Sequence, residues 1–242
     1  MAWSRPQGDL KIWDTFETNN LAGKKLRFVI QEIPENRYEE ALDHLCTNYL
    51  RYEDMRMSLN VVHDPDSVAY NRGFWKAALN QRISIGAFEV NDNNQVSILA
   101  GLNVLRVIDK DSSKIKRPIT SNMIATQKII NFVQNAAAEV DPCNRYGVDY
   151  FLTGTGLDIN PHYSRLGLGT RLLLTREKVG RAYNIPVTST MFSSLLAQKT
   201  AEKAGFVDIL ERGWDEVTDD HGELLFPGLK GLRWKIMDKK LL

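Results

Sequence analysis

The feature that most restricts the fold is a glycine-rich turn at residues 159–169, which reads INPHYSRLGLG. It follows a β-rich segment, DYFLTGTGLDI, and leads at once into an apolar helical run, TRLLLTREKVGRAY. A turn from a strand into a helix leaves several backbone N–H groups unpaired at the positive end of the helix dipole. Gly167 and Gly169 let a bulky anion approach those groups. The turn therefore suits a phosphate or pyrophosphate, although many turns of this kind only pack a tight corner.

Two nucleotide-binding motifs do not fit this turn. A P-loop requires a lysine followed by serine or threonine, and none stands here. A dinucleotide fingerprint needs three glycines, whereas Gly167 and Gly169 are followed by Leu172. The strand before a dinucleotide fingerprint also opens a βαβ unit, whereas the strand before this turn comes after an antiparallel hairpin. Neither motif is favoured.

The remaining segments predict a mixed sheet covered by helices. β-Branched and aromatic residues indicate strands at 26–33, 82–90, 96–108, 149–159, 187–191, 206–212 and 229–237. Apolar spacing indicates helices at 34–49, 67–80, 122–140, from the glycine turn to Pro186, and at 193–204. An early hairpin followed by strand–helix–strand units predicts an α/β fold of the mixed α+β kind, with a mostly antiparallel twisted sheet. We expect residues 1–20 to form a polar arm and residues 21–242 a single domain.

Composition argues against several functional classes. The 31 basic and 30 acidic residues give a net charge of +1, which does not favour nucleic-acid binding. Cys46 and Cys143, with four scattered histidines, predict neither a zinc site nor a disulfide framework. No stretch approaches the roughly 18 apolar residues of a membrane span, and the N-terminus lacks the apolar core of a secretory signal. We expect a cytoplasmic monomer that binds no metal, membrane or nucleic acid.

The glycine turn resembles the acetyl-CoA-binding motif of the GNAT N-acetyltransferase superfamily, commonly V-x-P-x-Y-R-G-x-G-x-G/A. The matching positions are Ile159, Pro161, Tyr163, Gly167 and Gly169. Ser164 stands where the family usually has Arg or Gln, and Arg165 follows it. A second stretch, SLLAQKTAEKAGF (194–206), is similar to the family's later helix, N-x-x-A-x-x-x-Y-x-x-x-G-F. The tyrosine that many members use as general acid is here Ala201.

Over about residues 26–238 the chain looks like the insect arylalkylamine N-acyltransferase-like branch of that superfamily. In that branch a Pro-Glu pair follows the first strand, matched by Pro34–Glu35, and a serine pair opens the late helix, matched by Ser193–Ser194. The stretch YLRYED (49–54) loosely matches the end of the branch's first helix, and HGELLF resembles its G-E-x-x-F hairpin. A further site serine of the branch is here Ala197.

The resemblance implies an N-acyltransferase that takes acetyl-CoA or another acyl-CoA as cosubstrate and acylates a small primary amine, such as an arylalkylamine, in a ternary complex. It implies parallel strands that splay apart to bind the acyl-CoA. A backbone N–H of Leu157 or Asp158 would hold the oxyanion. The implied cofactor-binding residues are Leu157, Asp158, Ile159, Ser164, Arg165, Leu166, Gly167, Leu168, Gly169, Thr170 and Arg171.

The same resemblance makes Glu35 the general base, which removes a proton from an amine with a pKa of about 10.4. The alternative is that Glu35 only complements the dipole of its helix. Ser193 or Ser194 would protonate the CoA thiolate, although helix capping also explains a serine there. The implied acceptor-binding residues are Pro34, Glu53 and Asp54.

The sequence leaves open the roles of several basic residues, and it allows two other functions. Arg176 and Lys178 are expected on a solvated helix face. Lys114, Lys116 and Arg117 either reach the 3′-phosphate of CoA or are solvated. One alternative function is a protein or peptide N-acetyltransferase. The other is a CoA-binding sensor or scaffold that has lost catalysis, which the residues at 164, 197 and 201 would favour.

Overall fold

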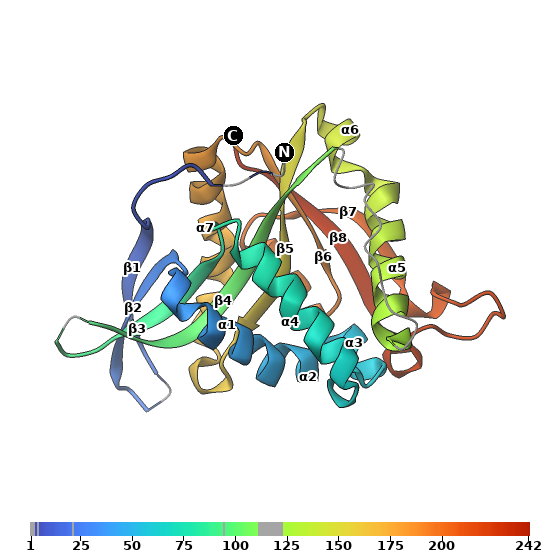
Figure 1. Ribbon diagram of the computed structural model, residues 1–242, viewed down its shortest axis with the longest axis horizontal. Coiled ribbons are helices and arrows are strands. Elements are labelled where there is room, and N and C mark those ends of the chain that lie inside the picture. Colours follow the sequence, from blue (N-terminus) through green and yellow to red (C-terminus); the bar gives the residue numbers. More distant parts are fainter. Residues whose placement is uncertain (1–2, 4, 21, 94, 111–122) are drawn as a thin grey trace.

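One eight-stranded mixed sheet runs through the computed structural model, which describes residues 3, 5–20, 22–93, 95–110 and 123–242 (Figure 1). The strand order is β1-β2-β3-β4-β5-β6-β8-β7. The strands are β1 (Ile12–Asn19), β2 (Lys25–Glu32), β3 (Ile85–Val90), β4 (Val96–Asp109), β5 (Tyr150–Ile159), β6 (Val187–Phe192), β7 (Val207–Gly213) and β8 (Arg233–Lys240). Neighbouring strands are antiparallel except β5 and β6. The predicted mixed, mostly antiparallel sheet is confirmed.

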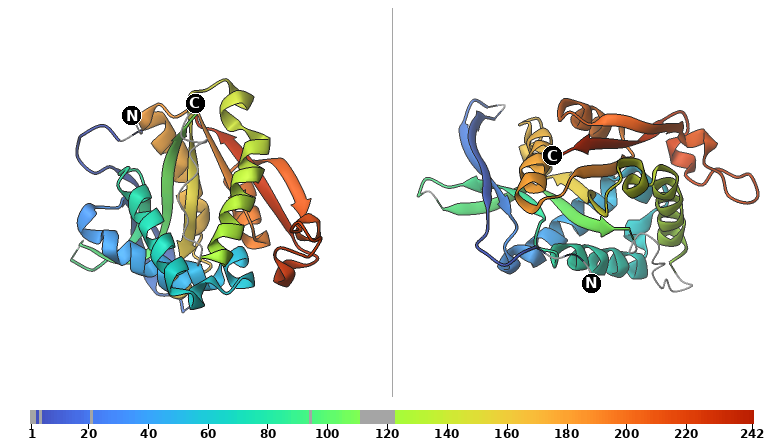
Figure 2. Two further views of the ribbon diagram at one scale, coloured as in Figure 1. Left: turned by 45° about the vertical axis from the view of Figure 1, so that its right-hand side comes forward. Right: turned by 90° about the horizontal axis from the view of Figure 1, so that it is seen from above.

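Helices cover both faces of this sheet (Figure 2). One face carries α1 (Tyr38–His44), α2 (Leu50–Tyr52), α3 (Asp54–Ser58), α4 (Pro65–Leu79) and α5 (Ile124–Val140), and the other carries α7 (Leu168–Tyr183) and α8 (Leu195–Lys203). The short α6 (Pro142–Tyr146) follows α5. Trp75 of α4 is fully buried on the first face, and Leu172 of α7 on the second. The two apolar cores hold the sheet between them, because each strand contributes side chains alternately to both faces.

The arm expected over residues 1–20 contains a strand of the sheet, β1, over its second half, which the sequence did not predict. β1 pairs with β2, and the ring of Phe16 stacks on that of Phe28 with centroids 5.4 Å apart. Arg5 is buried and forms an ion pair of 2.9 Å with Glu32 of β2. Its Nε also donates to the hydroxyl of Tyr183 on α7. The strand escaped prediction because an edge strand with one solvated face has a polar composition.

The helix expected over 34–49 is interrupted by a π-helical segment. A 3₁₀ turn, η1 (Glu35–Arg37), leads into α1, and the π-helix η2 (Leu45–Tyr49) joins α1 to α2. Single π-helical turns are rare and occur often at functional sites. The chain then bends at Glu53 into α3, and the Glu53 side chain caps this helix by accepting from the N–H of Arg56.

The other predicted elements are present with shifted ends. β3 begins at Ile85 instead of 82, and β8 begins at Arg233 instead of 229 because a 3₁₀ turn, η7 (Pro227–Leu229), precedes it. The charged loop predicted at 109–121 falls almost wholly outside the described residues. The predicted roles of Lys114, Lys116 and Arg117 therefore lie outside the described part of the chain.

Candidate active site

The glycine turn joins β5 to α7 and leaves the N-terminus of α7 open. Gly167 has a φ of +76°, in the left-handed region that favours glycine, and no side chain caps the helix. The first helical hydrogen bond runs from the N–H of Arg171 to the carbonyl of Gly167. The N–H groups of residues 168–170 thus have no helical partner. A Cβ built on Gly167 would meet nothing within 4 Å. The corner therefore presents free donors to an anion.

β5 and β6 separate soon after they meet. Among the described residues the two strands pair only at Leu152 and Thr188. On the other side of β5, the N–H of Asn160 donates to the carbonyl of Ala100 on β4. Because antiparallel strands alternate in direction of hydrogen bonding, the N–H of Asp158 also points to β4, whereas those of Leu157 and Ile159 point to β6. We call the unpaired part of these strands the β5–β6 split. Its geometry favours Leu157 over Asp158 as the oxyanion donor.

Glu53 and Ser193 meet at the end of β6, although they are 140 residues apart. The Ser193 hydroxyl donates to Oε1 of Glu53 at 2.7 Å. The other oxygen, Oε2, accepts from the guanidinium of Arg56 at 2.8 Å and from its backbone N–H at 3.2 Å. Glu53 is only 9% exposed. Arg56 thus orients a buried carboxylate whose second oxygen faces a serine hydroxyl.

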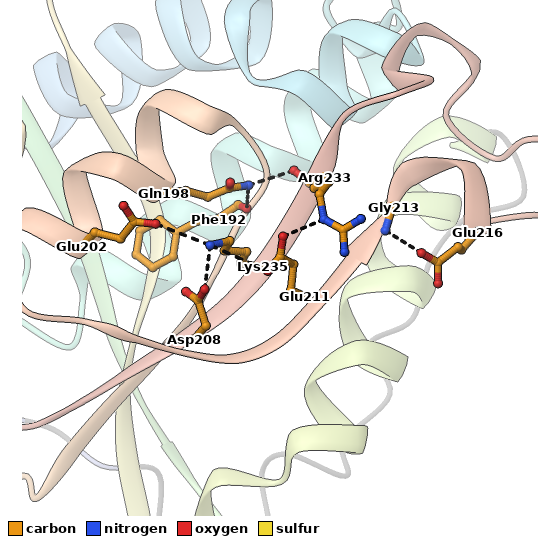
Figure 3. Close-up of polar contacts among 9 residues, drawn as sticks. All are labelled: Phe192, Gln198, Glu202, Asp208, Glu211, Gly213, Glu216, Arg233 and Lys235. Atoms are coloured by element: carbon orange, nitrogen blue, oxygen red, sulfur yellow. Dashed lines mark hydrogen bonds and ion pairs between the residues drawn. The ribbon is translucent and has the colours of Figure 1, made fainter.

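Gln198 links the backbone of Phe192, the residue before Ser193, to that of Arg233 on β8 (Figure 3). Its buried Nε2 donates to the carbonyl of Phe192 at 3.1 Å and to that of Arg233 on β8 at 2.8 Å. Ser194 has a different role, because its hydroxyl caps α8 by accepting from the N–H of Ala197 at 3.2 Å. Capping therefore explains Ser194, whereas Ser193 is directed to the carboxylate. The two predicted serines are separated by these contacts.

Solved structures with the same architecture come from insects. A putative arylalkylamine N-acetyltransferase 7 from the yellow fever mosquito Aedes aegypti superposes with a TM-score of 0.89, covering 99% of this chain and 100% of that one at 24% identity. The chain has the GNAT fold. Arylalkylamine N-acetyltransferase 2 of Aedes aegypti gives a TM-score of 0.77 at 17% identity, covering 89% of this chain and 99% of that one. A polyamine N-acetyltransferase of Drosophila melanogaster gives 0.69 at 16%, covering 87% and 97%. The sequence matches no protein-family model and no curated protein.

Glu35 does not join the Glu53–Ser193 pair in this GNAT fold. Its side chain is 67% exposed and forms an ion pair of 3.3 Å with Arg82. Glu32, at the end of β2, is linked to Leu157 through successive partners on β3 and β4. Three strand spacings of about 4.8 Å place β2 roughly 14 Å from β5 at this level. Pro34 and Glu35 follow Glu32 directly, so both predicted residues lie away from Ser193.

Of the two arginines expected beside the glycine turn, Arg171 points elsewhere. Its guanidinium forms an ion pair of 3.1 Å with Asp14 and lies 3.9 Å from the ring centroid of Phe16. Lys178 is exposed, as expected, and its side chain also donates to the carbonyl of Trp13 at 2.6 Å. Both side chains contact the strand β1, which lies beside α7.

Arg165 stays exposed in the turn with a φ of +64°. In the GNAT pattern this position is a glycine. A left-handed conformation costs a non-glycine residue about 1–2 kcal/mol. The neighbouring Ser164 is also exposed, and Leu166 and Thr170 are half-buried. A Cβ on Gly169 would stand 3.3 Å from Thr200 of α8, so glycine there lets the two helices approach.

Asp158 directs its side chain to α1, away from the glycine corner. Its Oδ2 lies 2.6 Å from Nε2 of His44, and both side chains are largely buried. Tyr49, at the end of the π-helical segment, packs edge-on against Trp75 and lies under the guanidinium of Arg56. Burial, chiefly, raises the pKa of the Tyr49 hydroxyl, which therefore stays protonated at neutral pH. Asp158 thus belongs to the face that also carries Glu53.

Two further sequence expectations concern Asp54 and Arg176. Asp54 is half-buried, and burial followed by the charge of Glu53 raises the pKa of its carboxyl. Arg176, expected on a solvated face, is 1% exposed and lies between α7 and the sheet. Only its place in a helix facing the sheet, among apolar neighbours, distinguishes it in sequence from the exposed Arg181.

One cavity in the described part of the structure has a volume of about 580 Å³. It is bounded by α5 and the hairpin that follows β7, with Phe132, Arg212, Leu225 and Trp234 among its walls. Neither Glu53 nor Ser193 lines it. Its mixed polar walls carry none of the groups described above, so we do not assign the chemistry to it.

The described residues contain no cluster of three histidine, cysteine, aspartate or glutamate side chains arranged to hold a metal ion. None of the helices in the described part of the chain combines the length and the apolar character needed to span a membrane.

Proposed function

We propose that this protein is an acyl-CoA-dependent N-acyltransferase that acetylates a small primary amine by direct attack. The observation that carries the proposal is the buried hydrogen bond between Ser193 and Glu53 at the end of β6. It places a carboxylate and a hydroxyl beside a pair of separated parallel strands. The helix α7 connects these two strands, and its open N-terminus supplies free backbone donors. Together these features provide an anion site, an oxyanion donor and a base.

The cosubstrate would lie along β5 and the glycine corner. Its diphosphate would accept hydrogen bonds from the N–H groups of residues 168–170, where the helix dipole favours negative charge. Its thioester carbonyl would accept from the N–H of Leu157 in the β5–β6 split. Loss of one such donor typically lowers kcat by about 100- to 1,000-fold.

Glu53 is the proposed base in place of Glu35. The deprotonated amine attacks the thioester carbon, so a nitrogen–carbon bond forms and the oxyanion develops at Leu157. Glu53 then takes the excess proton from the nitrogen. As the carbon–sulfur bond breaks, the proton returns from Glu53 through the Ser193 hydroxyl to the CoA sulfur. Glu53 ends the cycle as a carboxylate, and no covalent acyl-enzyme is needed.

An aromatic cluster beside Ser193 supports an apolar or aromatic amine as acceptor. Phe192 is the register partner of Lys235, so Ser193 lies next to Trp234. Trp234 packs with Phe132 and Trp214, which both also contact Phe226, and the ring centroids of these pairs lie 5.1 to 6.2 Å apart. The indole N–H groups of Trp214 and Trp234 have no hydrogen-bond partner among the described residues. A buried indole N–H normally finds one, and a bound amine's polar substituent would supply it.

The test is release of free CoA thiol from acetyl-CoA in the presence of an amine panel. The panel contains phenylethylamine, tyramine, agmatine and a short peptide with a free N-terminus. We expect turnover with the aromatic amines. Turnover with the peptide alone would assign the chain to protein acetylation. Acetyl-CoA binding without turnover of any amine would make it a sensor.

A further inference from the structure

Arg176 lies at the point where β5 and β6 part. It extends from α7 toward the sheet, and its Nε donates to Oδ1 of Asn103 on β4 at 2.9 Å. Its Nη1 donates to the hydroxyls of Thr188 at 3.1 Å and Thr190 at 2.7 Å on β6. A Cβ built on Gly154 of β5 would fall 2.1 Å from Nη2. The guanidinium therefore occupies the vertex of the β5–β6 split and touches all three central strands.

This cation has no carboxylate to balance it. Its hydrogen-bond partners are neutral oxygens, and among the described residues no aspartate or glutamate forms an ion pair with it. Burial lowers the pKa of Arg176 to about 9, so it still carries its charge at neutral pH. A buried charge without a counter-ion is unfavourable by several kcal/mol. The fold gives no compensating ion pair, which indicates that the missing anion belongs to a ligand or a reaction step.

Part of the guanidinium is still available. The hydrogens of Nη2 have no partner among the described residues, while Nε and Nη1 are engaged by the three neutral side chains. Nη2 faces the backbone of β5 at Gly154, where a glycine is needed to make room for it. Nη2 is thus held against the strand that supplies the split.

The vertex is close to the expected oxyanion. Asn103, which Arg176 binds directly, is the register partner of Leu157. Partners across antiparallel strands lie about 4.5 to 5.5 Å apart at Cα. The guanidinium therefore contacts the side chain of the residue that pairs with Leu157, among side chains that are almost fully buried. At separations of this order in a protein interior, a unit charge acts strongly on another.

We propose that Arg176 is an electrostatic positioning residue that stabilises the negative charge developing on the thioester in the β5–β6 split. This inference rests on the proposed function. Asn103 and the two threonines hold the cation in place before the reaction, so no reorganisation is needed as charge develops. Because the thioester itself is neutral, the cation favours the transition state more than the bound cosubstrate.

Arg176→Gln is the first test, since glutamine keeps hydrogen bonding to Asn103 or Thr190 without the charge. We expect kcat to fall by about 10- to 100-fold, while the Kd for CoA by calorimetry stays within about threefold. Arg176→Lys keeps the charge and should recover kcat to about fivefold or more above the glutamine variant. Arg181→Gln removes an exposed arginine of the same helix, paired with Glu177, and should change neither quantity.

Other outcomes would overturn the proposal. If kcat of Arg176→Gln stays within about threefold of wild type, the charge has no catalytic effect. If the lysine and glutamine variants lose kcat equally and both bind CoA weakly, Arg176 only spaces the strands. If the wild type releases no CoA with any amine, the proposed function and this inference fall together, a result that differs from an active Arg176→Gln.

Asn103→Asp keeps the inference testable where the Arg176 variants do not fold. It puts a carboxylate against Nε and neutralises the cation without removing it. We expect kcat to fall by about tenfold or more with unchanged CoA affinity. An unchanged kcat in this variant, with its melting temperature intact, would contradict an electrostatic role.

Discussion

Glu53→Gln is the perturbation that bears most directly on the proposed chemistry. Glutamine has the same shape and keeps an oxygen for Ser193, but it cannot accept the amine proton. A general base typically contributes about 100- to 10,000-fold, so kcat should fall by that factor, which is about 3–5 kcal/mol in the barrier. The variant also leaves Arg56 without its counter-ion. The side chains of Glu53 and Arg56 are 6% and 11% exposed. Removing one partner of such a buried pair lowers the free energy of unfolding by about 3–5 kcal/mol.

The stability loss sets the conditions of the assay. For a chain of this size, about 3 kcal/mol lowers the melting temperature by roughly 6–12 °C. Rates of CoA release should therefore be measured at 20 °C, with a thermal melt of each variant and CoA binding by calorimetry. Glu35→Gln is the matched control, because Glu35 is an exposed glutamate paired with Arg82. We expect it to keep kcat within about twofold. The reasoning is refuted if Glu53→Gln retains more than a tenth of the wild-type kcat, or if Glu35→Gln loses it.

Three further predictions separate local roles. Ser193→Ala should lower kcat by about tenfold or more, whereas Ser194→Ala should lose a helix cap worth about 1 kcal/mol with kcat nearly unchanged; equal kinetic losses would contradict the assignment. Asp238 is fully buried, and burial raises its carboxyl pKa, so the folded state loses stability as pH rises through that pKa. Asp238→Asn should therefore raise the melting temperature at pH 7, with the difference fading below about pH 4, and a constant difference would exclude this cause. Arg5→Ala should destabilise the fold by about 3–5 kcal/mol because it strands buried Glu32, and adding Glu32→Gln should recover part of the loss.

Local patterns of the sequence predicted the glycine corner, the succession of strands and helices along the chain and the mixed sheet. Those features depend on neighbouring residues, such as a strand that runs directly into Gly167 and α7. The resemblance also singled out Ser193, which the structure shows in contact with a carboxylate. Its partner Glu53 was predicted to bind the acceptor, and only the three-dimensional contact shows a carboxylate held against the serine.

The errors come from contacts between distant segments. Arg171 reads as a cofactor ligand because the turn is next to it, but β1, 157 residues earlier in the chain, captures its guanidinium. Glu35 follows a strand as the family pattern requires, yet the order of strands in the sheet places that end away from Ser193. Arg176 was predicted on the surface because charged residues are mostly exposed, although its position in the helix faces the sheet. Periodicity gives a helix face, and it does not say which charged residues that face buries.

Calorimetric titration of the protein with CoA tests the central claim, that backbone donors at the corner of β5 and α7 hold the cosubstrate. We expect one molecule of CoA to bind per chain. Gly169→Leu puts a bulky side chain at the N-terminus of α7, 3.3 Å from Thr200 of α8, and should abolish the heat while the fold still melts cooperatively. No heat with the wild type, or equal affinity in Gly169→Leu, would contradict the account.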